Sequence, residues 1–368
     1  MRTIRRLIYR EVVASVVFVA VGFLALFFFF DFVDELSNIG KGPAGAPYKM
    51  SQALGYVTMQ IPNHLYELLP IAVLIGTIFV MARLAQSSEY TILRTSGLGP
   101  FRALRTLLGL GLIFTLLTFA TGDYLAPGAD RIAQLMKARY EGRISIGLTG
   151  AWLKEKQAFH TFNVNVGALS PDGDMRGVRI FEADARGFLV SMTQAPRARF
   201  ADDGSWTLLD AERSEFVTEA TQAKVDRTKV PALRWPTGIS PEMVSVALLK
   251  PDRMSTIDLF QYIQHLDANG QTSQRYEIEF WRKVFYPLSC IVMVVLALPF
   301  AYLHFRSRGI TSFVFGGVLI GISFFLLNNV FGYIGNLQNW WPWLTAASPG
   351  LIYSVMSLGA FGWLVLRR

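Results

Sequence analysis

Few residues of this chain have the types and spacing that chemistry at a site requires. The sequence contains no Gly-x-x-x-x-Gly-Lys-Ser/Thr phosphate loop, no His-Glu-x-x-His or paired-cysteine metal motif and no Gly-x-Ser-x-Gly nucleophile elbow. The histidines are scattered through different regions, at His64, His160, His265 and His304. The single cysteine, Cys290, lies inside an apolar run, which indicates a small buried hydrophobic residue and excludes an intrachain disulfide. We therefore predict no catalytic residue, no metal site, no cofactor and no ATP hydrolysis by the chain itself.

One polar segment, residues 83–100, has a pattern suited to contact with another protein. Serines at positions 87 and 88 can cap a short helix with an acidic first turn, and glycines at 97 and 99 can end it. A short helix between two membrane spans is what a membrane subunit needs to receive force from a soluble partner, and a plain interfacial helix is the alternative. The residues predicted to contact such a soluble partner are Ser88, Glu89, Tyr90, Leu93 and Arg94.

The elements that flank this segment are apolar runs long enough to cross a membrane. Hydrophobic residues make up 52% of the chain and charged residues only 17%, against about 25% in soluble proteins. A bilayer core requires roughly 20 apolar residues in a helix. Six spans are predicted, at residues 12–30, 68–82 with an extension back to about 62, 106–122 and 284–303, and as two spans within 309–366 that the polar turn 335–339 separates.

Arginines beside these runs predict the orientation of the chain. If the N-terminus is cytoplasmic, the inner segments hold 12 arginines and two glutamates, whereas the rest of the chain holds 23 basic and 25 acidic residues. Excess positive charge on the cytoplasmic side is the rule for membrane proteins. The net charge of +8 therefore reflects membrane orientation, and we expect no nucleic-acid partner. Six spans also return the C-terminus to the cytoplasm, so we predict a multi-pass inner-membrane protein.

Residues 125–280 have the turn spacing of a β-domain. Gly, Asp and Pro signals recur at 171–174, 184–187 and 202–205, and short alternating segments lie between them. Strands are expected at 159–166, 177–183, 188–192, 197–201 and 206–209, which indicates an antiparallel sandwich or jelly roll, with helices at 256–267 and 273–283 closing the domain. The predicted fold is an α-helical membrane protein with six transmembrane helices and a periplasmic all-β, jelly-roll-like domain. Its divisions are 1–124, 125–280 and 281–368.

Short segments along the whole chain resemble one known family. They are residues 81–89 with the Ser-Gly pair at 96–97, 32–36, 122–127, 152–154, 259–270, Lys283, 287–289 and 299–300. In this order and spacing they resemble the LptF/LptG permeases, the membrane subunits of the lipopolysaccharide exporter of Gram-negative bacteria. The exit of the first span and residues 152–154 look more like the LptG branch.

The resemblance implies a set of partners. A permease of this family pairs with an LptF-like permease and is driven by an LptB-like ATPase dimer. Lipopolysaccharide is extracted from the inner membrane, and an LptC-like membrane-anchored protein passes it to a periplasmic bridge towards the outer membrane. Membrane lipids surround the spans.

The resemblance also implies roles for particular residues. The lateral gates and cavity would use residues of the first and fifth spans, namely Phe23, Phe27, Phe30, Phe324 and Asn328. Family members often carry basic residues at the exit of the first span, where this chain has Asp31, Asp34 and Glu35. The lipid-head-group role therefore moves to basic residues after the third span, within a predicted helix at 130–140, namely Arg131, Lys137 and Arg139. These residues have an alternative role as contacts to anionic phospholipid or to the β-domain.

In the β-domain, the alternating apolar residues Phe162, Val164 and Ile180 would line a path for acyl chains. An ordinary closed sandwich core is the alternative. Asn328 has the alternative role of an interhelical hydrogen-bonding group. For the whole protein, a membrane-anchored envelope assembly protein whose β-domain binds a partner remains a second hypothesis. A secondary transporter is a third, which the scarcity of charged residues within the spans weakens.

Overall fold

The computed structural model describes residues 2–40, 48–87, 89–141, 150–170, 172–201, 203–219, 222–248, 250–302 and 310–363. The chain forms two compact units. The first comprises Met1–Asp34, Gln60–Ala129 and Glu277–Arg368, and the second comprises Glu35–Met59 and Asp130–Tyr276. The first unit contains most of the long apolar helices, and the second contains the sheet.

Six helical stretches among the described residues are long and apolar enough to cross a membrane. The helices that form them are α1 (Arg2–Leu36), α2 (Met50–Gln86), α4 (Pro100–Ala120) with the π-helix η1 (Thr121–Leu125) and α5 (Ala126–Glu141), α8 (Gln274–Phe285) with η3 (Tyr286–Leu288), α9 (Ser289–Ala297) and η4 (Leu298–Tyr302), α10 (Ile310–Leu337) and α11 (Pro342–Phe361). The six predicted spans are therefore confirmed. Most of the observed helices are longer than the apolar runs, since they continue into the polar residues that flank those runs.

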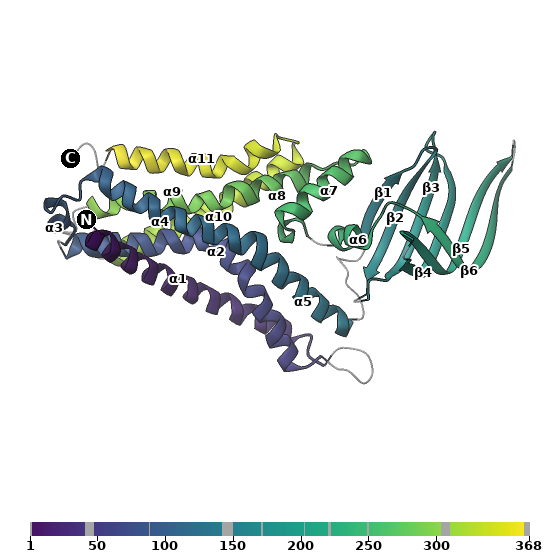
Figure 1. Cartoon of the computed structure of the whole chain (residues 1–368), viewed down its shortest axis with the longest axis horizontal. Helices are drawn as coiled ribbons and strands as arrows, with labels where there is room; N and C mark the ends of the chain where they lie inside the picture. The colour runs from purple at the N-terminus through teal and green to yellow at the C-terminus, as the bar shows by residue number, and fades with distance from the viewer. Residues whose placement is uncertain are drawn as a thin grey trace. The chain divides into compact units, whose positions relative to one another are not determined.

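The first unit is packed around α2. Leu74, Ile78 and Met81 of this helix are fully buried, and small residues allow close approach of its neighbours. A Cβ atom at Gly76 would lie only 2.8 Å from the backbone of Val16 in α1. Close packing at small residues is how helices associate in lipid, where the hydrophobic effect does not drive them together. The start of α1, the end of α11 and the short helix α3 (Glu89–Thr95) lie at the same end of this unit (Figure 1).

The second unit contains one six-stranded antiparallel sheet. Its strands are β1 (Ala151–Lys156), β2 (His160–Leu169), β3 (Met175–Asp184), β4 (Leu189–Phe200), β5 (Ser205–Glu219) and β6 (Gln222–Pro236), paired in chain order as Figure 1 shows. The all-β prediction is confirmed. The strands form a meander without crossovers because short turns join each strand directly to the next. The strands expected at 188–192 and 197–201 are one strand, β4, which continues through Pro196.

Helices α6 (Pro241–Ala247) and α7 (Thr256–Ala268) follow the sheet, with the 3-10 turn η2 (Pro251–Arg253) between them. Helix α7 matches the expectation at 256–267. Ser255 and Asp258 form a capping box at its start, which satisfies two backbone N–H groups that would otherwise have no partner. Helix α8 likewise matches the helix expected at 273–283.

Candidate functional site

Helix α3 is held firmly against the first unit by one aromatic side chain. Tyr90 is 3% exposed, and its ring meets that of Tyr302 edge-on at a centroid distance of 5.2 Å. The guanidinium carbon of Arg94 lies 5.4 Å from the centre of the Tyr302 ring, and Leu93 packs against the buried core. Glu89 is exposed. A force applied at the exposed Glu89 side of α3 would therefore reach η4 through the contact of Tyr90 with Tyr302.

The end of α3 has the geometry that its glycine predicts. Gly97 has a φ of +99°, and the N–H of Leu98 donates to the carbonyl of Leu93 over 3.0 Å. This is the hydrogen bond that closes a helix at a left-handed glycine. Of the predicted coupling residues, Ser88 lies outside the described residues. The other four are on α3.

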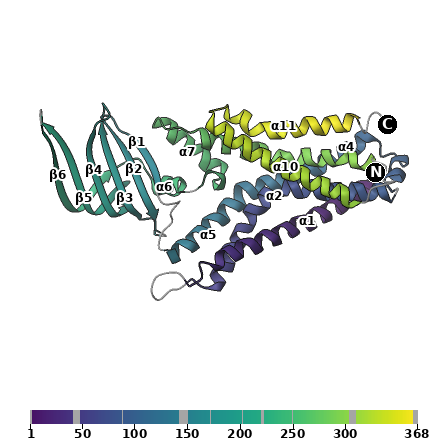
Figure 2. The same cartoon turned by 180° about the vertical axis from the view of Figure 1, so that it is seen from behind.

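The predicted gate residues lie in two different settings. Phe23 and Phe27 of α1 pack against a buried cluster of Leu68, Ile71 and Ile75 in α2, which α10 also contacts. The ribbons of α1, α2 and α10 are labelled in Figure 2. Phe30 is exposed. This part of α1 therefore has one face that packs on α2, with Phe23 and Phe27, and one exposed face, with Phe30.

Phe324 and Asn328 of α10 are instead buried. The Phe324 ring lies between those of Tyr286 and Tyr353, at centroid distances of 6.1 and 5.1 Å. The side-chain amide of Asn328 donates to the Phe324 carbonyl over 2.9 Å. This hydrogen bond of Asn328 therefore joins two residues of α10 and does not link α10 to another helix.

The acidic exit of the first span has a partner that the sequence did not reveal. The Oδ2 atom of Asp31 lies 2.6 Å from Nε2 of His64, which joins α1 to α2. The rings of Phe27 and His64 are 5.0 Å apart. Since the two polar residues are 33 positions apart, no local pattern connects them.

The predicted head-group residues on α5 differ in their surroundings. Lys137 is neutralised, because its Nζ atom lies 3.3 Å from Oε2 of the buried Glu35 and 4.7 Å from the centre of the Tyr56 ring. Arg131 is 58% exposed, and its nearest carboxylate oxygen, on Asp258, is 3.9 Å away. The side chain of Arg139 lies outside the described residues. Arg131 is therefore the accessible cation of the described pair.

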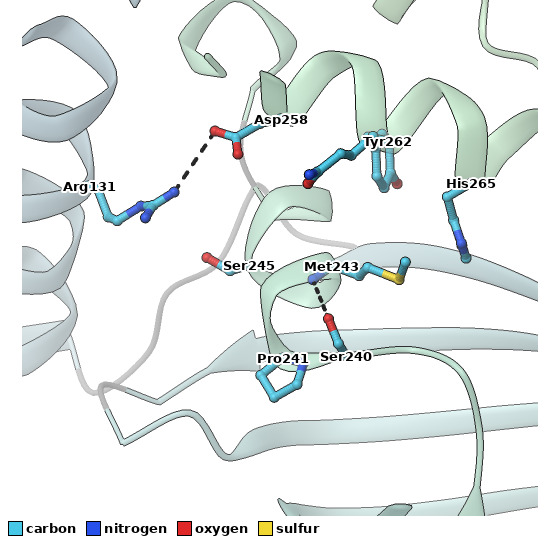
Figure 3. Close-up of a pocket in the computed structure, with 9 residues that line it drawn as sticks. Arg131, Ser240, Pro241, Met243, Ser245, Asp258, Tyr262 and His265 are labelled. Carbon is cyan, nitrogen blue, oxygen red and sulfur yellow. Dashed lines mark hydrogen bonds and ion pairs between the residues drawn. The ribbon is translucent and has the colours of Figure 1, made fainter. Parts of the chain in front are cut away.

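Arg131 borders a pocket of about 470 Å³ within the second unit. The pocket lies between α5, the start of α6 and one face of α7, and Figure 3 shows the side chains that line it. Behind Arg131, the carboxylate of Asp130 accepts a hydrogen bond from Arg253, and both residues are largely buried. This ion pair fixes the start of the α5 segment that carries Arg131.

The inner face of the sheet changes from apolar to polar along the strands. Residues directly opposite one another share a face. One cross-strand row contains Leu153, Val164, Ile180, Thr193 and Arg213. The next row towards the β1–β2 turn contains Glu155, Phe162, Glu182, Ser191 and Glu215. Val164 and Ile180 are buried, whereas Phe162 is only partly buried and lies in the more acidic row.

A hydrogen-bonded network occupies the polar end of this face. Glu182 accepts from Ser191 over 2.6 Å and from Arg213 over 3.2 Å, and Nδ1 of His160 is 3.2 Å from its other oxygen. At the apolar end, the indole of Trp206 donates to the Ile239 carbonyl over 2.8 Å, and α6 lies against β1 and β2. The apolar end is therefore covered by the chain that follows β6.

A buried lysine is a feature to which the sequence reasoning gave no role. Lys283 of α8 is buried, and its Nζ atom donates to the carbonyl of Gly122 in η1 over 2.8 Å. Short π-helical segments are common at functional sites and leave backbone groups that need partners. Because basic residues commonly flank apolar runs, the position of Lys283 just before such a run gave no signal that it is buried.

Comparison with known proteins identifies close similarity over nearly the whole chain. Residues 6–367 match the family described as lipopolysaccharide export system permease LptF/LptG. The lipopolysaccharide export system permease protein LptG of Escherichia coli K12 is 27% identical over 340 residues, which cover 92% of this chain and 90% of that protein. The protein of the same name from Haemophilus influenzae is 26% identical over 369 residues, which cover 100% of this chain and 99% of that protein.

Proposed function

The chain belongs to the lipopolysaccharide export permease family LptF/LptG, and we propose that it is the LptG-like membrane subunit of an ABC transporter. In this role it extracts lipopolysaccharide from the inner membrane and passes it to a periplasmic bridge. The family match over residues 6–367, together with relatives named LptG, is the observation that carries the proposal. In this role the chain is the membrane subunit of the transporter, and a separate subunit hydrolyses ATP.

The proposed assembly contains an LptF-like permease, an LptB-like ATPase dimer and an LptC-like protein. The exposed Glu89 and Arg94 on α3 would meet the ATPase, while the buried Tyr90 transmits the movement to η4. Isolation of the tagged chain in mild detergent, followed by mass spectrometry, tests this assembly. An ATPase subunit and a second permease should copurify in stoichiometric amounts, and their absence would contradict the proposal.

The orientation places α3 and both chain ends in the cytoplasm. It is supported by the excess of arginine in the segments at that end and by an even number of candidate spans in the described residues. The sheet then lies in the periplasm, where a bridge protein can reach it. With this orientation, the proposed membrane parts are 1–124 and 281–368 and the proposed periplasmic part is 125–280, while the helices of two spans extend into its two ends.

The β-domain would contact acyl chains on the apolar part of its inner face. Val164 and Ile180 belong to this part, whereas Phe162 stands beside Glu182 at its polar boundary. Since α6 and Ile239 cover the apolar part, we infer that this cover moves before a lipid reaches it. Photo-crosslinkers at positions 164 and 180 should capture lipopolysaccharide during turnover, and capture at neither would favour an ordinary closed core.

Movement of lipid between the membrane and the β-domain requires an opening near α1 and α10. Phe23, Phe27 and the exposed Phe30 on α1 would contact acyl chains. Phe324 and Asn328 are buried on α10 and would form the inner side of this gate. Arg131 is the favoured contact for the polar head group, with Arg139 as a second cation. Lys137 would contribute less because Glu35 already neutralises it.

A further inference from the structure

Helix α7 presents a polar face to the pocket beside Arg131. Asp258, Gln261, Tyr262 and His265 have the spacing of one helical face, and all four line the pocket (Figure 3). The volume of about 470 Å³ falls within the range of roughly 300–1,000 Å³ that small-molecule sites occupy. The face is therefore large enough to hold one chemical group of a ligand.

The charges in the pocket exclude a simple anion site. Asp258 accepts hydrogen bonds and repels phosphate, yet its Oδ2 atom is only 3.9 Å from the Arg131 guanidinium. At this distance the two groups form a loose ion pair and no direct hydrogen bond. A group placed between them must accept from Arg131 and donate to Asp258, and a hydroxyl group does both.

The other polar groups that line the pocket also call for a ligand group that both donates and accepts hydrogen bonds. Gln261 offers an amide that donates and accepts, and Ser240 and Ser245 offer hydroxyls. Ser240 already accepts from the N–H of Met243 over 3.3 Å and keeps its hydroxyl proton for another acceptor. A ligand with several neighbouring hydroxyls satisfies such a set better than a phosphate, an amine or an acyl chain.

Two rings supply an apolar surface beside these polar groups. Tyr262 and His265 stack with an interplanar angle of 24° and a centroid distance of 6.2 Å. Burial lowers the pKa of His265, which keeps its ring neutral near pH 7. The Nε2 atom of His265 is buried and has no hydrogen-bond partner among the described residues. The C–H face of a sugar ring packs well on such neutral rings.

We propose that this pocket binds a hydroxyl-rich saccharide of the lipopolysaccharide head group through Arg131, Asp258 and Gln261. The proposal rests on the proposed function for the identity of the saccharide. It assigns the pocket to sugar hydroxyls, so that phosphate recognition is not its main role. The pocket thereby orients the head group next to the β-domain.

Binding of an oligosaccharide to the intact complex in detergent tests the proposal by saturation-transfer NMR and calorimetry. The probe is the core oligosaccharide freed of lipid and phosphate, and inorganic phosphate is the second probe. Gln261→Ala should weaken oligosaccharide binding at least fivefold. Gln264→Ala is the matched control, because Gln264 is exposed on the same helix but does not line the pocket. It should bind as the unaltered protein does.

Each outcome decides the proposal. Binding of the oligosaccharide that Gln261→Ala weakens and Gln264→Ala preserves supports it. Binding of inorganic phosphate alone, or equal oligosaccharide binding by both variants, overturns it. Oligosaccharide binding by a complex that moves no lipopolysaccharide would contradict the proposed function and leave the pocket assignment standing. Transport without oligosaccharide binding would contradict only the pocket assignment.

Discussion

Replacement of Tyr90 by alanine should uncouple the ATPase from the membrane helices. The Tyr90 ring is 3% exposed and makes an edge-on contact with Tyr302, so its removal leaves a cavity between α3 and η4. Truncation of a buried aromatic residue to alanine costs about 3–5 kcal/mol. Since each 1.4 kcal/mol corresponds to about a tenfold change in an equilibrium constant, the docked state of α3 should weaken by more than about 100-fold.

The assay compares lipopolysaccharide transport with ATP hydrolysis in the purified complex. Tyr90→Ala should reduce transport at least tenfold while basal hydrolysis continues, because the proposed assembly places the ATPase active site on another subunit. Tyr90→Phe is the control, since it keeps the ring and its contact with Tyr302, and it should transport within about twofold of the unaltered protein. Full transport by Tyr90→Ala, in a complex that remains assembled, would refute the role of α3 in force transmission.

Three further predictions concern orientation, charge and pH. An impermeant thiol reagent applied to intact spheroplasts should label a cysteine introduced at Arg186 but not one introduced at Arg94. The opposite labelling pattern would show that the orientation is reversed. The native Cys290 is buried and contributes little background labelling. Glu89→Gln should weaken ATPase association in a pull-down, whereas unchanged association and transport would show that this charge is unimportant. The backbone N–H of Phe188, followed by that of Arg186, lowers the pKa of Asp184 in the β3–β4 turn. The ionised Asp184 therefore stabilises the fold above its ordinary pKa of 3.8, and this stabilisation is lost as pH falls through the lowered pKa. The stability of Asp184→Asn should consequently depend less on pH in this acidic range. An unchanged pH dependence of acid unfolding would contradict the assignment.

The spans were predictable because their signal is local. Long apolar runs with flanking arginines indicate both position and orientation, and the structure contains helices at all six. Their ends were less predictable. Helix α2 begins at Met50, well before the apolar run, because its first turns contain polar residues such as Ser51, Gln52 and Gln60 and carry no hydrophobic signal of a span. Helix α1 continues through Asp31, whose charge has a partner in His64 that is distant in sequence.

The β-domain was predictable as a class but not in its connections. Turn residues and alternation indicated antiparallel strands. The sequence predicted separate strands at 188–192 and 197–201, yet Pro196 is exposed and β4 continues through it. The order of strands in the sheet depends on which strands pair. The spacing of turn residues along the chain indicates where strands begin and end but not which strands are neighbours.

The candidate site was only partly predictable. The short helix α3 was predictable because its acidic first turn and the glycine that ends it are within a few residues of one another, whereas its coupling role stays a prediction. The neutralisation of Lys137 by Glu35 joins residues 102 positions apart, and the pocket joins Arg131 to α6 and α7 more than 100 positions later. Charges that look equivalent in the sequence therefore differ because of partners that only the tertiary fold supplies.

The central claim is that this chain couples ATP hydrolysis to lipopolysaccharide extraction. The most direct measurement is ATP-dependent release of lipopolysaccharide from proteoliposomes that contain the purified complex, with a periplasmic acceptor protein outside. The account predicts release that requires ATP and this chain, and that falls at least tenfold in Tyr90→Ala but not in Tyr90→Phe. Release that proceeds equally without the chain, or none by an assembled complex that hydrolyses ATP, would contradict it.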